Sequence, residues 1–326
     1  MFFVISGYCI AHAAVRSQNA TRPIAKFALA RIRRIYPPYL LAASIAIVLS
    51  LTMTVLIQHH VLRSSQLADL NLLHQGWRFY VGTLTLTQLL LHTDVVIRVI
   101  WSLGYEVTFY AIFAVLLLVP AWGKSTPRLL DMIGLITFFS LLLQNFGTHL
   151  APFPWDLWPQ FGFGALVYQV LAQPKRRVPK VVFALCATLS VVYAARHHAE
   201  TWIDGMSTGF EAAFTLGFAV TLLLLFRRDS WLSRLPLVRL LAGVGLFSYS
   251  LYLIHLLALG IVTQGLNRIH LLDAHPWLLY VLRFATCLAV GRLFFQFCER
   301  PFLDTHQRQA EREAAVNAPT APVTAP

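Results

Sequence analysis

The stretch Tyr39-Leu-Leu-Ala-Ala-Ser-Ile-Ala-Ile-Val-Leu-Ser-Leu-Thr-Met-Thr-Val-Leu-Ile-Gln58 contains no charged residue. A helix rises about 1.5 Å per residue, so a run of this length can cross the roughly 30 Å hydrocarbon core of a bilayer. The whole chain has the same character, since 57% of its residues are apolar and 12% are charged. Soluble domains are about 45–50% apolar and about 25% charged. The sequence therefore predicts an all-α, polytopic integral membrane helical bundle.

Other apolar runs of similar length predict seven further spans. Together with the first run, the predicted full spans are 39–58, 102–122, 129–146, 157–172, 180–196, 209–226, 240–262 and 276–298. The apolar segment from Met1 to Val15 is too short to cross, and we expect it to be a truncated N-terminal span. We expect Tyr80–Leu91 to be re-entrant or interfacial. These patterns predict one membrane domain at 1–303, followed by a disordered cytoplasmic tail at 304–326.

The basic residues predict the orientation and exclude some partners. The net charge is +12, and most Lys and Arg residues lie in alternate connections between spans, which is typical of cytoplasmic loops. This dispersal predicts a cytoplasmic C-terminus and no nucleic-acid partner. The four cysteines have neither metal-binding nor disulfide-framework spacing, and no two histidines have the i, i+4 spacing of a zinc site. We therefore expect no metal.

Two ionisable residues inside apolar spans are the first candidates for chemistry, namely Glu106 and His255. A charge at the bilayer centre costs about 2.5–3.5 kcal/mol on insertion scales, so such residues usually serve a function. Glu106 and Tyr110 share one helical face, as do Ser248, Tyr252 and His255. The two polar stripes are predicted at similar depth near the outer surface, where they could face each other across a cavity. A structural pair, helix-bridging hydrogen bonds and an interfacial tyrosine belt are the alternatives.

A basic cluster precedes the span at 39–58 and contains Arg31, Arg33 and Arg34. We expect these residues at the end of a loop that leads into the span. The planar guanidinium group suits phosphate because it forms bidentate, charge-assisted hydrogen bonds. The alternative is a positive-inside anchor that contacts anionic lipid.

Five sequence motifs occur along the chain. They are Phe2-Phe-Val-Ile-Ser-Gly7, Arg31-Ile-Arg-Arg-Ile-Tyr-Pro37, Trp101-Ser-Leu-Gly-Tyr-Glu106 continued by Phe109-Tyr110, Ser248-Tyr-Ser-Leu-Tyr-Leu-Ile-His255, and Glu299-Arg-Pro-Phe302. In this order they resemble the acyltransferase-3 family of integral membrane O-acyltransferases, over residues 1 to about 303. The resemblance implies transfer of an acyl group, commonly acetyl from a coenzyme A thioester, to a hydroxyl of a cell-envelope glycan or other carbohydrate-containing acceptor. It also implies a bacterial inner membrane.

The resemblance implies roles for individual residues. Arg31 and Arg34 would contact the donor phosphates with Arg33 as a helper, and Glu106, Tyr110 and His255 would line the acyl-transfer cavity. Ser248 and Tyr252 would complete that cavity on the helical face of His255.

One family feature has no counterpart in this sequence. Family members usually carry an Arg and a catalytic His on an earlier helix. We expect a shortened gene product; the alternatives are a substitute such as His12 or His255, or an inactive protein. A glycan or lipid transporter and a non-catalytic membrane scaffold are the competing functions, although no paired halves with broken helices are evident.

Overall fold

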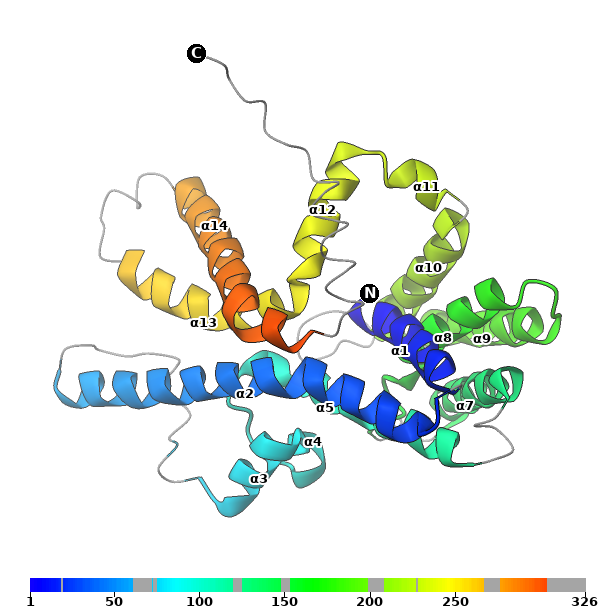
Figure 1. Ribbon diagram of the computed structural model, residues 1–326, viewed down its shortest axis with the longest axis horizontal. Coiled ribbons are helices and arrows are strands. Elements are labelled where there is room, and N and C mark those ends of the chain that lie inside the picture. The colour runs from blue at the N-terminus through cyan, green and yellow to red at the C-terminus, as the bar shows by residue number, and fades with distance from the viewer. Residues whose placement is uncertain are drawn as a thin grey trace, which may run out of the picture. The chain divides into compact units, whose positions relative to one another are not determined.

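The protein is an assembly of helices (Figure 1). The computed structural model describes residues 1–18, 20–60, 72, 75–119, 125–147, 153–198, 208–226, 228–266 and 276–303. These ranges contain no strand. Six of their helices are long and apolar enough to cross a membrane, and one bent pair adds a possible seventh. The predicted polytopic helical bundle is therefore confirmed, although the predicted number of eight full spans is not reached in the described part of the chain.

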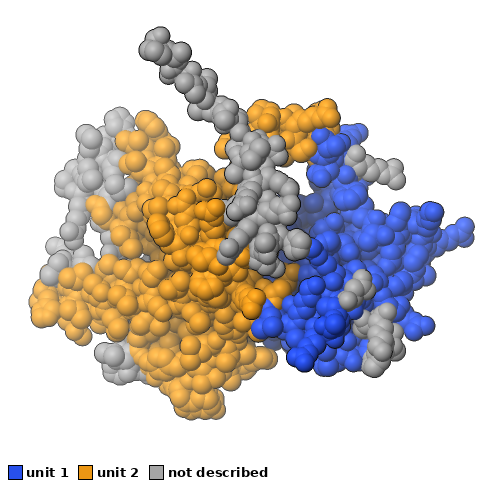
Figure 2. Space-filling view, viewed as in Figure 1, with its two compact units in different colours: residues 1–29, 105–230 blue, residues 30–104, 231–326 orange. Residues whose placement is uncertain are grey.

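Two compact units make up the chain (Figure 2). Unit 1 comprises Met1–Leu29 and Tyr105–Ser230, and unit 2 comprises Ala30–Gly104 and Trp231–Pro326. The first unit contains α1 (Phe2–Gln18), most of α5 (Trp101–Leu118), α7 (Thr126–Phe146), α8 (Trp158–Ala172), α9 (Val178–Arg196) and α10 (Thr208–Phe226). The second contains most of α2 (Pro23–Gln58), α3 (Trp77–Thr85), α4 (Gln88–Leu91), η2 (Arg98–Ile100), α12 (Pro236–Leu246), α13 (Ser248–Leu266), α14 (Pro276–Phe294), the π-helical turn η4 (Phe295–Glu299) and η5 (Arg300–Phe302). The short helix α11 (Asp229–Leu232) lies at the boundary in sequence.

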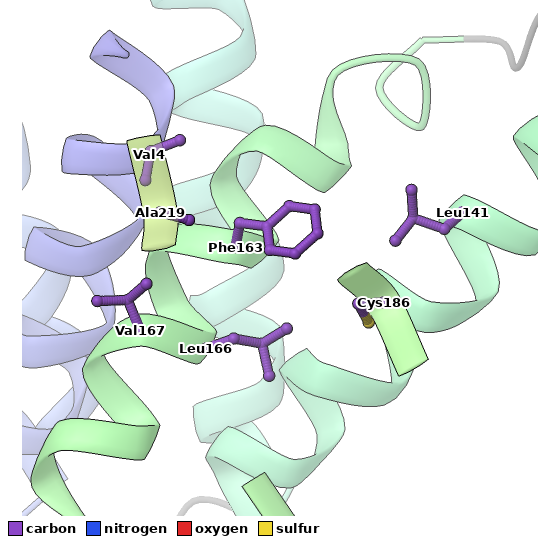
Figure 3. Packing of buried hydrophobic residues seen from close by; sticks show 7 residues of the cluster. All are labelled: Val4, Leu141, Phe163, Leu166, Val167, Cys186 and Ala219. Atoms are coloured by element: carbon purple, nitrogen blue, oxygen red, sulfur yellow. The ribbon is translucent and has the colours of Figure 1, made fainter. Parts of the chain in front are cut away.

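Helix α8 is the centre of unit 1, where it packs against α1, α7, α9 and α10. Its side chains Phe163, Leu166 and Val167 form a buried cluster with residues from the surrounding helices (Figure 3). The fifteen residues of α8 extend about 22 Å. The prediction of a full span at 157–172 is therefore not supported by its length.

Helices α1 and α8 approach each other so closely that their backbones touch. A Cβ atom on Gly7 would lie 2.1 Å from the carbonyl oxygen of Phe161, and one on Gly164 would lie 1.9 Å from that of Val4. Small residues commonly allow such contacts between membrane helices, where packing rather than the hydrophobic effect holds helices together. Glycine is therefore required on both sides of this interface.

Helix α2 starts much earlier than expected, at Pro23, and has 36 residues. The basic cluster therefore lies within a helix, and its placement at the end of a loop was wrong. Pro37 and Pro38 both lie inside α2. Membrane helices tolerate proline because neighbouring groups satisfy the carbonyls that it leaves free.

The span predicted at 240–262 is interrupted. Helices α12 and α13 meet at Phe247 with a bend of 72°. Gly243 and Gly245 precede the bend and weaken the helix there, while the Ser248 hydroxyl donates to the carbonyl of Gly245 at 2.8 Å. Helices α3 and α4 have nine and four residues, so the Tyr80–Leu91 segment does not form a spanning helix, as predicted.

Candidate functional site

Glu106 has two hydrogen-bond donors on one carboxylate oxygen. It lies in the second turn of α5, in unit 1, and is partly buried. Its Oε1 accepts a hydrogen bond of 2.9 Å from Ser6 on α1 and one of 2.5 Å from Tyr110. The shared face predicted for Glu106 and Tyr110 is therefore present. The second oxygen, Oε2, has no hydrogen-bond partner in the described part of the chain.

Tyr110 positions this carboxylate. A phenol carries a single O–H proton, and Tyr110 donates it to Glu106. The Tyr110 ring packs edge-on against Phe27, with the ring centroids 6.2 Å apart. In this arrangement Tyr110 orients Glu106 and does not offer its proton to a substrate.

Asp156 is a second carboxylate in unit 1 and is not among the residues predicted from the sequence. Its Oδ2 accepts a hydrogen bond from Tyr105, the residue before Glu106. The amide of Gln144 donates to the carbonyls of Trp155 at 2.9 Å and of Asp156 at 2.7 Å, which holds the turn before α8. Burial raises the pKa of Asp156, and the hydrogen bond from Tyr105 partly offsets this effect. An acidic residue between Trp155 and Trp158 was the available sequence signal.

His255 lies on α13 in unit 2 and has a defined tautomer. Its Nδ1 lies 2.8 Å from the carbonyl oxygen of Tyr252 and 3.2 Å from that of Leu251. Carbonyl oxygens only accept hydrogen bonds, so Nδ1 carries the proton. In the neutral ring, Nε2 then keeps its lone pair and can accept a proton.

The other two polar residues of the predicted stripe form hydrogen bonds within unit 2. Tyr252 donates to the carbonyl of Val99, and its hydroxyl lies 2.5 Å from Oγ of Ser102. Ser248 is exposed, and its hydroxyl is bonded at the bend between α12 and α13. Both residues therefore fix the position of α13 within unit 2.

The start of α13 also bonds to α2 and to the π-helical turn after α14. Tyr249 donates to the carbonyl of Ile35 at 3.0 Å, next to the basic cluster. Ser250 donates to Oε2 of Glu299 at 2.5 Å, and the two residues are 0% and 4% exposed. Ser6 and Glu299 both lie in motifs named above, but no feature of those motifs distinguishes them individually.

The basic cluster lies on α2 within the same unit as His255. Arg33 and Arg34 are exposed and Arg31 is partly buried. No acidic residue occurs anywhere in α2, so the positive charge of this helix is not offset by its own residues. Unit 2 therefore contains the predicted phosphate-binding residues together with His255, Tyr252 and Ser248.

Glu106 and Tyr110 belong to unit 1, whereas His255 belongs to unit 2. The proposed cavity shared by the two polar stripes stays a prediction. Across the described ranges, no group of three or more His, Cys, Asp or Glu residues could hold a metal ion.

A family model described as an acyltransferase domain matches residues 1–295. The chain belongs to the acyltransferase-3 family. The match includes all candidate residues from Arg31 to His255. No curated protein and no solved structure matches the chain significantly. Membership of the acyltransferase-3 family, together with several apolar helices of spanning length, identifies an integral membrane protein of the acyltransferase class.

Proposed function

We propose that this protein transfers an acyl group, most simply acetyl, from a coenzyme A thioester to a hydroxyl of a cell-envelope glycan or other carbohydrate-containing acceptor. The observation that carries this proposal is Glu106, whose Oε1 is held by hydroxyls from two helices while Oε2 has no described partner. A carboxylate retained and oriented inside an apolar span indicates a functional site. The setting would be a bacterial inner membrane, with the C-terminus in the cytoplasm.

The donor would bind through the basic cluster on α2. Arg31, Arg33 and Arg34 lie on one helix that has no acidic residue, and guanidinium groups bind phosphate oxygens bidentately. Coenzyme A is a polyanion, so these residues would raise its local concentration and orient the thioester. Arg33 would assist through its charge, because its exposed side chain can reach a phosphate from solution.

His255 would act as the base. Its Nε2 takes the proton from the acceptor hydroxyl as the oxygen attacks the thioester carbonyl. A C–O bond forms and the C–S bond breaks, and the proton then passes to the departing thiolate. Glu106 would accept a hydrogen bond through Oε2 and orient a reacting group, while Tyr110 and Ser6 hold its other oxygen.

Radiolabel transfer tests this proposal. Membranes that contain the protein are incubated with acetyl-labelled coenzyme A, and label is measured in the carbohydrate fraction. Glu106→Gln and His255→Ala are expected to lower transfer at least a hundredfold, in the range found for acid–base groups. Quantitative immunoblotting of the membrane fraction checks that insertion is equal. Unchanged transfer in both variants would defeat the assignment.

A glycan or lipid transporter is the second candidate, because α12 and α13 form an interrupted helix and such helices often surround transport sites. Labelled glycan flux across vesicles without added acyl donor would favour this function. Acetyl transfer that proceeds in detergent, where no membrane separates two compartments, would favour the enzyme.

A further inference from the structure

A small polar pocket lies in unit 1 between α7, α8, α9 and α10. Its volume is about 40 Å³, and none of the residues that hold Glu106 lines it. The polar residues that matter for its chemistry are Gln144, Asp156, Gln160, Tyr193, Glu211 and Thr215. Polar side chains gathered inside a membrane bundle usually mark a ligand or ion pathway.

The lining selects a class of ligand. The described residues of the lining include two carboxylates, two amides and several hydroxyls, and no Lys, Arg or His is among them. Glu211 interacts electrostatically with the amino group of Met1, whereas Asp156 has no ion-pair partner in the described ranges. Two carboxylates would repel a polyanion such as coenzyme A. A neutral alcohol fits, because it can donate to a carboxylate and exchange hydrogen bonds with an amide.

One polar group at this pocket needs a further hydrogen-bond partner. Oδ1 of Asp156 is buried and has none. Thr215 also lines the pocket and is 4% exposed. Buried polar groups are nearly always paired, so an occupant that donates a hydrogen bond would satisfy this oxygen of Asp156. Because a water molecule needs about 10–15 Å³ of such a cavity, the pocket has room for a few waters or a single hydroxyl-bearing carbon.

We propose that this pocket binds a hydroxyl-bearing carbon of a neutral carbohydrate acceptor, whose ring remains at the pocket mouth. The pocket wall is connected to α5, because Tyr105 donates to Asp156 and directly precedes Glu106. An acceptor bound here is thereby held in the same unit as the candidate carboxylate. The identification of the occupant as an acceptor rests on the proposed function, whereas its binding does not require turnover.

Thermal unfolding of the purified protein in lipid nanodiscs tests this binding. The ligands are methyl β-D-glucoside and methyl glycosides of other neutral hexoses, with glucose 6-phosphate as the anionic comparison. A saturating neutral glycoside is expected to raise Tm by about 2 °C or more, and glucose 6-phosphate is expected to leave Tm unchanged.

Two variants of one helix locate the binding site. Thr215→Val keeps the side-chain shape, removes the hydroxyl and is expected to lose the rise in Tm. Thr221→Val is the matched control, because the Thr221 hydroxyl is already bonded to the carbonyl of Gly217. Gln160→Leu provides a second pocket variant if Thr215→Val does not fold.

The possible outcomes separate this inference from the proposed function. An unchanged Tm with every neutral glycoside would overturn it, and the pocket would then hold water alone. An equal rise with glucose 6-phosphate, or an equal rise in both pocket variants, would also overturn it. Glycoside binding that both pocket variants lose, without acetyl transfer by the unmodified protein, would support this pocket and reject the proposed function. Acetyl transfer without glycoside-dependent stabilisation would support the proposed function and reject this pocket as the binding site.

Discussion

The hydroxyl of Ser6 donates a 2.9 Å hydrogen bond to Oε1 of Glu106, so two residues one hundred positions apart in the sequence meet on one carboxylate. Tyr110 donates to the same oxygen. Neither proton is available to a substrate in this arrangement, and both hold the carboxylate in one orientation. The chemistry proposed for Glu106 therefore depends on the packing of α1 against the rest of unit 1.

Removal of one of these donors should weaken catalysis. Tyr110→Phe keeps the ring against Phe27 and loses the hydrogen bond to Glu106. A hydrogen bond to a charged group contributes about 1.5–3 kcal/mol, so kcat for acetyl transfer is expected to fall at least tenfold, with KM for acetyl coenzyme A unchanged. Tyr8→Phe is the control on α1. The same kcat in both variants would contradict the positioning role.

A double variant tests whether Glu106 and His255 serve the same catalytic step. Residues that serve the same step are strongly non-additive. Glu106→Gln combined with His255→Ala should therefore be about as slow as the slower single variant. Steady-state transfer rates of the four proteins measure this coupling. A double variant whose loss equals the product of the single losses would show that the two groups act independently.

The basic cluster on α2 should affect the donor and not the acceptor. Arg34→Ala is expected to raise KM for acetyl coenzyme A about tenfold, since a charge-assisted bond to phosphate is lost. Lys26→Ala removes a charge from the same helix and should change KM less than twofold. Kinetics at several ionic strengths give a second measure, because salt screens an exposed interaction of this kind. Equal effects of the two substitutions would indicate a general membrane anchor.

The glycine contact between α1 and α8 should dominate stability in unit 1. Gly164→Ala places a methyl group 1.9 Å from the carbonyl oxygen of Val4, and overpacking of this kind costs about 1–3 kcal/mol or more. Gly217→Ala is the matched control, because nothing lies within 4 Å of its added Cβ; alanine also favours a helix by about 1 kcal/mol. Thermal unfolding in one detergent should show a lower Tm for the first variant and an equal or higher Tm for the second.

Asp156 should make stability depend on pH. Burial raises its pKa above the unfolded value of about 3.9, so the folded protein binds this proton more tightly. The contribution of Asp156 to stability is then largest below about pH 4 and declines as pH rises through the folded pKa. Asp156→Asn has no such titration, and its Tm relative to the unmodified protein should increase from about pH 4 to about pH 7. A constant difference in Tm would show that Asp156 does not titrate in this way.

The sequence was sufficient to predict the class of fold and several helices. The predicted spans at 129–146, 180–196 and 209–226 match α7, α9 and α10 to within a few residues. A long uncharged run inside a membrane can satisfy its backbone hydrogen bonds within the segment by forming a helix, so its helical structure follows from composition. The bend at Phe247 was not predicted, because it depends on a local bond between Ser248 and Gly245 and on packing around α13.

The candidate site could be predicted only in part. Glu106 and Tyr110 were paired correctly from helical periodicity, since they are one turn apart. Ser6 and Asp156 were missed because their contacts join residues that are distant in sequence, and hydroxyl or carboxylate side chains give no signal of such partners. Side-chain contacts within one helix could therefore be predicted from the sequence, whereas contacts between helices could not.

The backbone contact at Gly7 has a consequence for the chemistry proposed for Glu106 as well as for packing. Ser6 is the residue before Gly7. The distance between its hydroxyl and Glu106 therefore depends on how closely α1 packs against Phe161 of α8. A methyl group at position 7 would push α1 away from α8 and weaken the hydrogen bond from Ser6 to Glu106, while both of these side chains stay unchanged. The proposed transfer activity is thus expected to depend on Gly7, a residue that has no side chain.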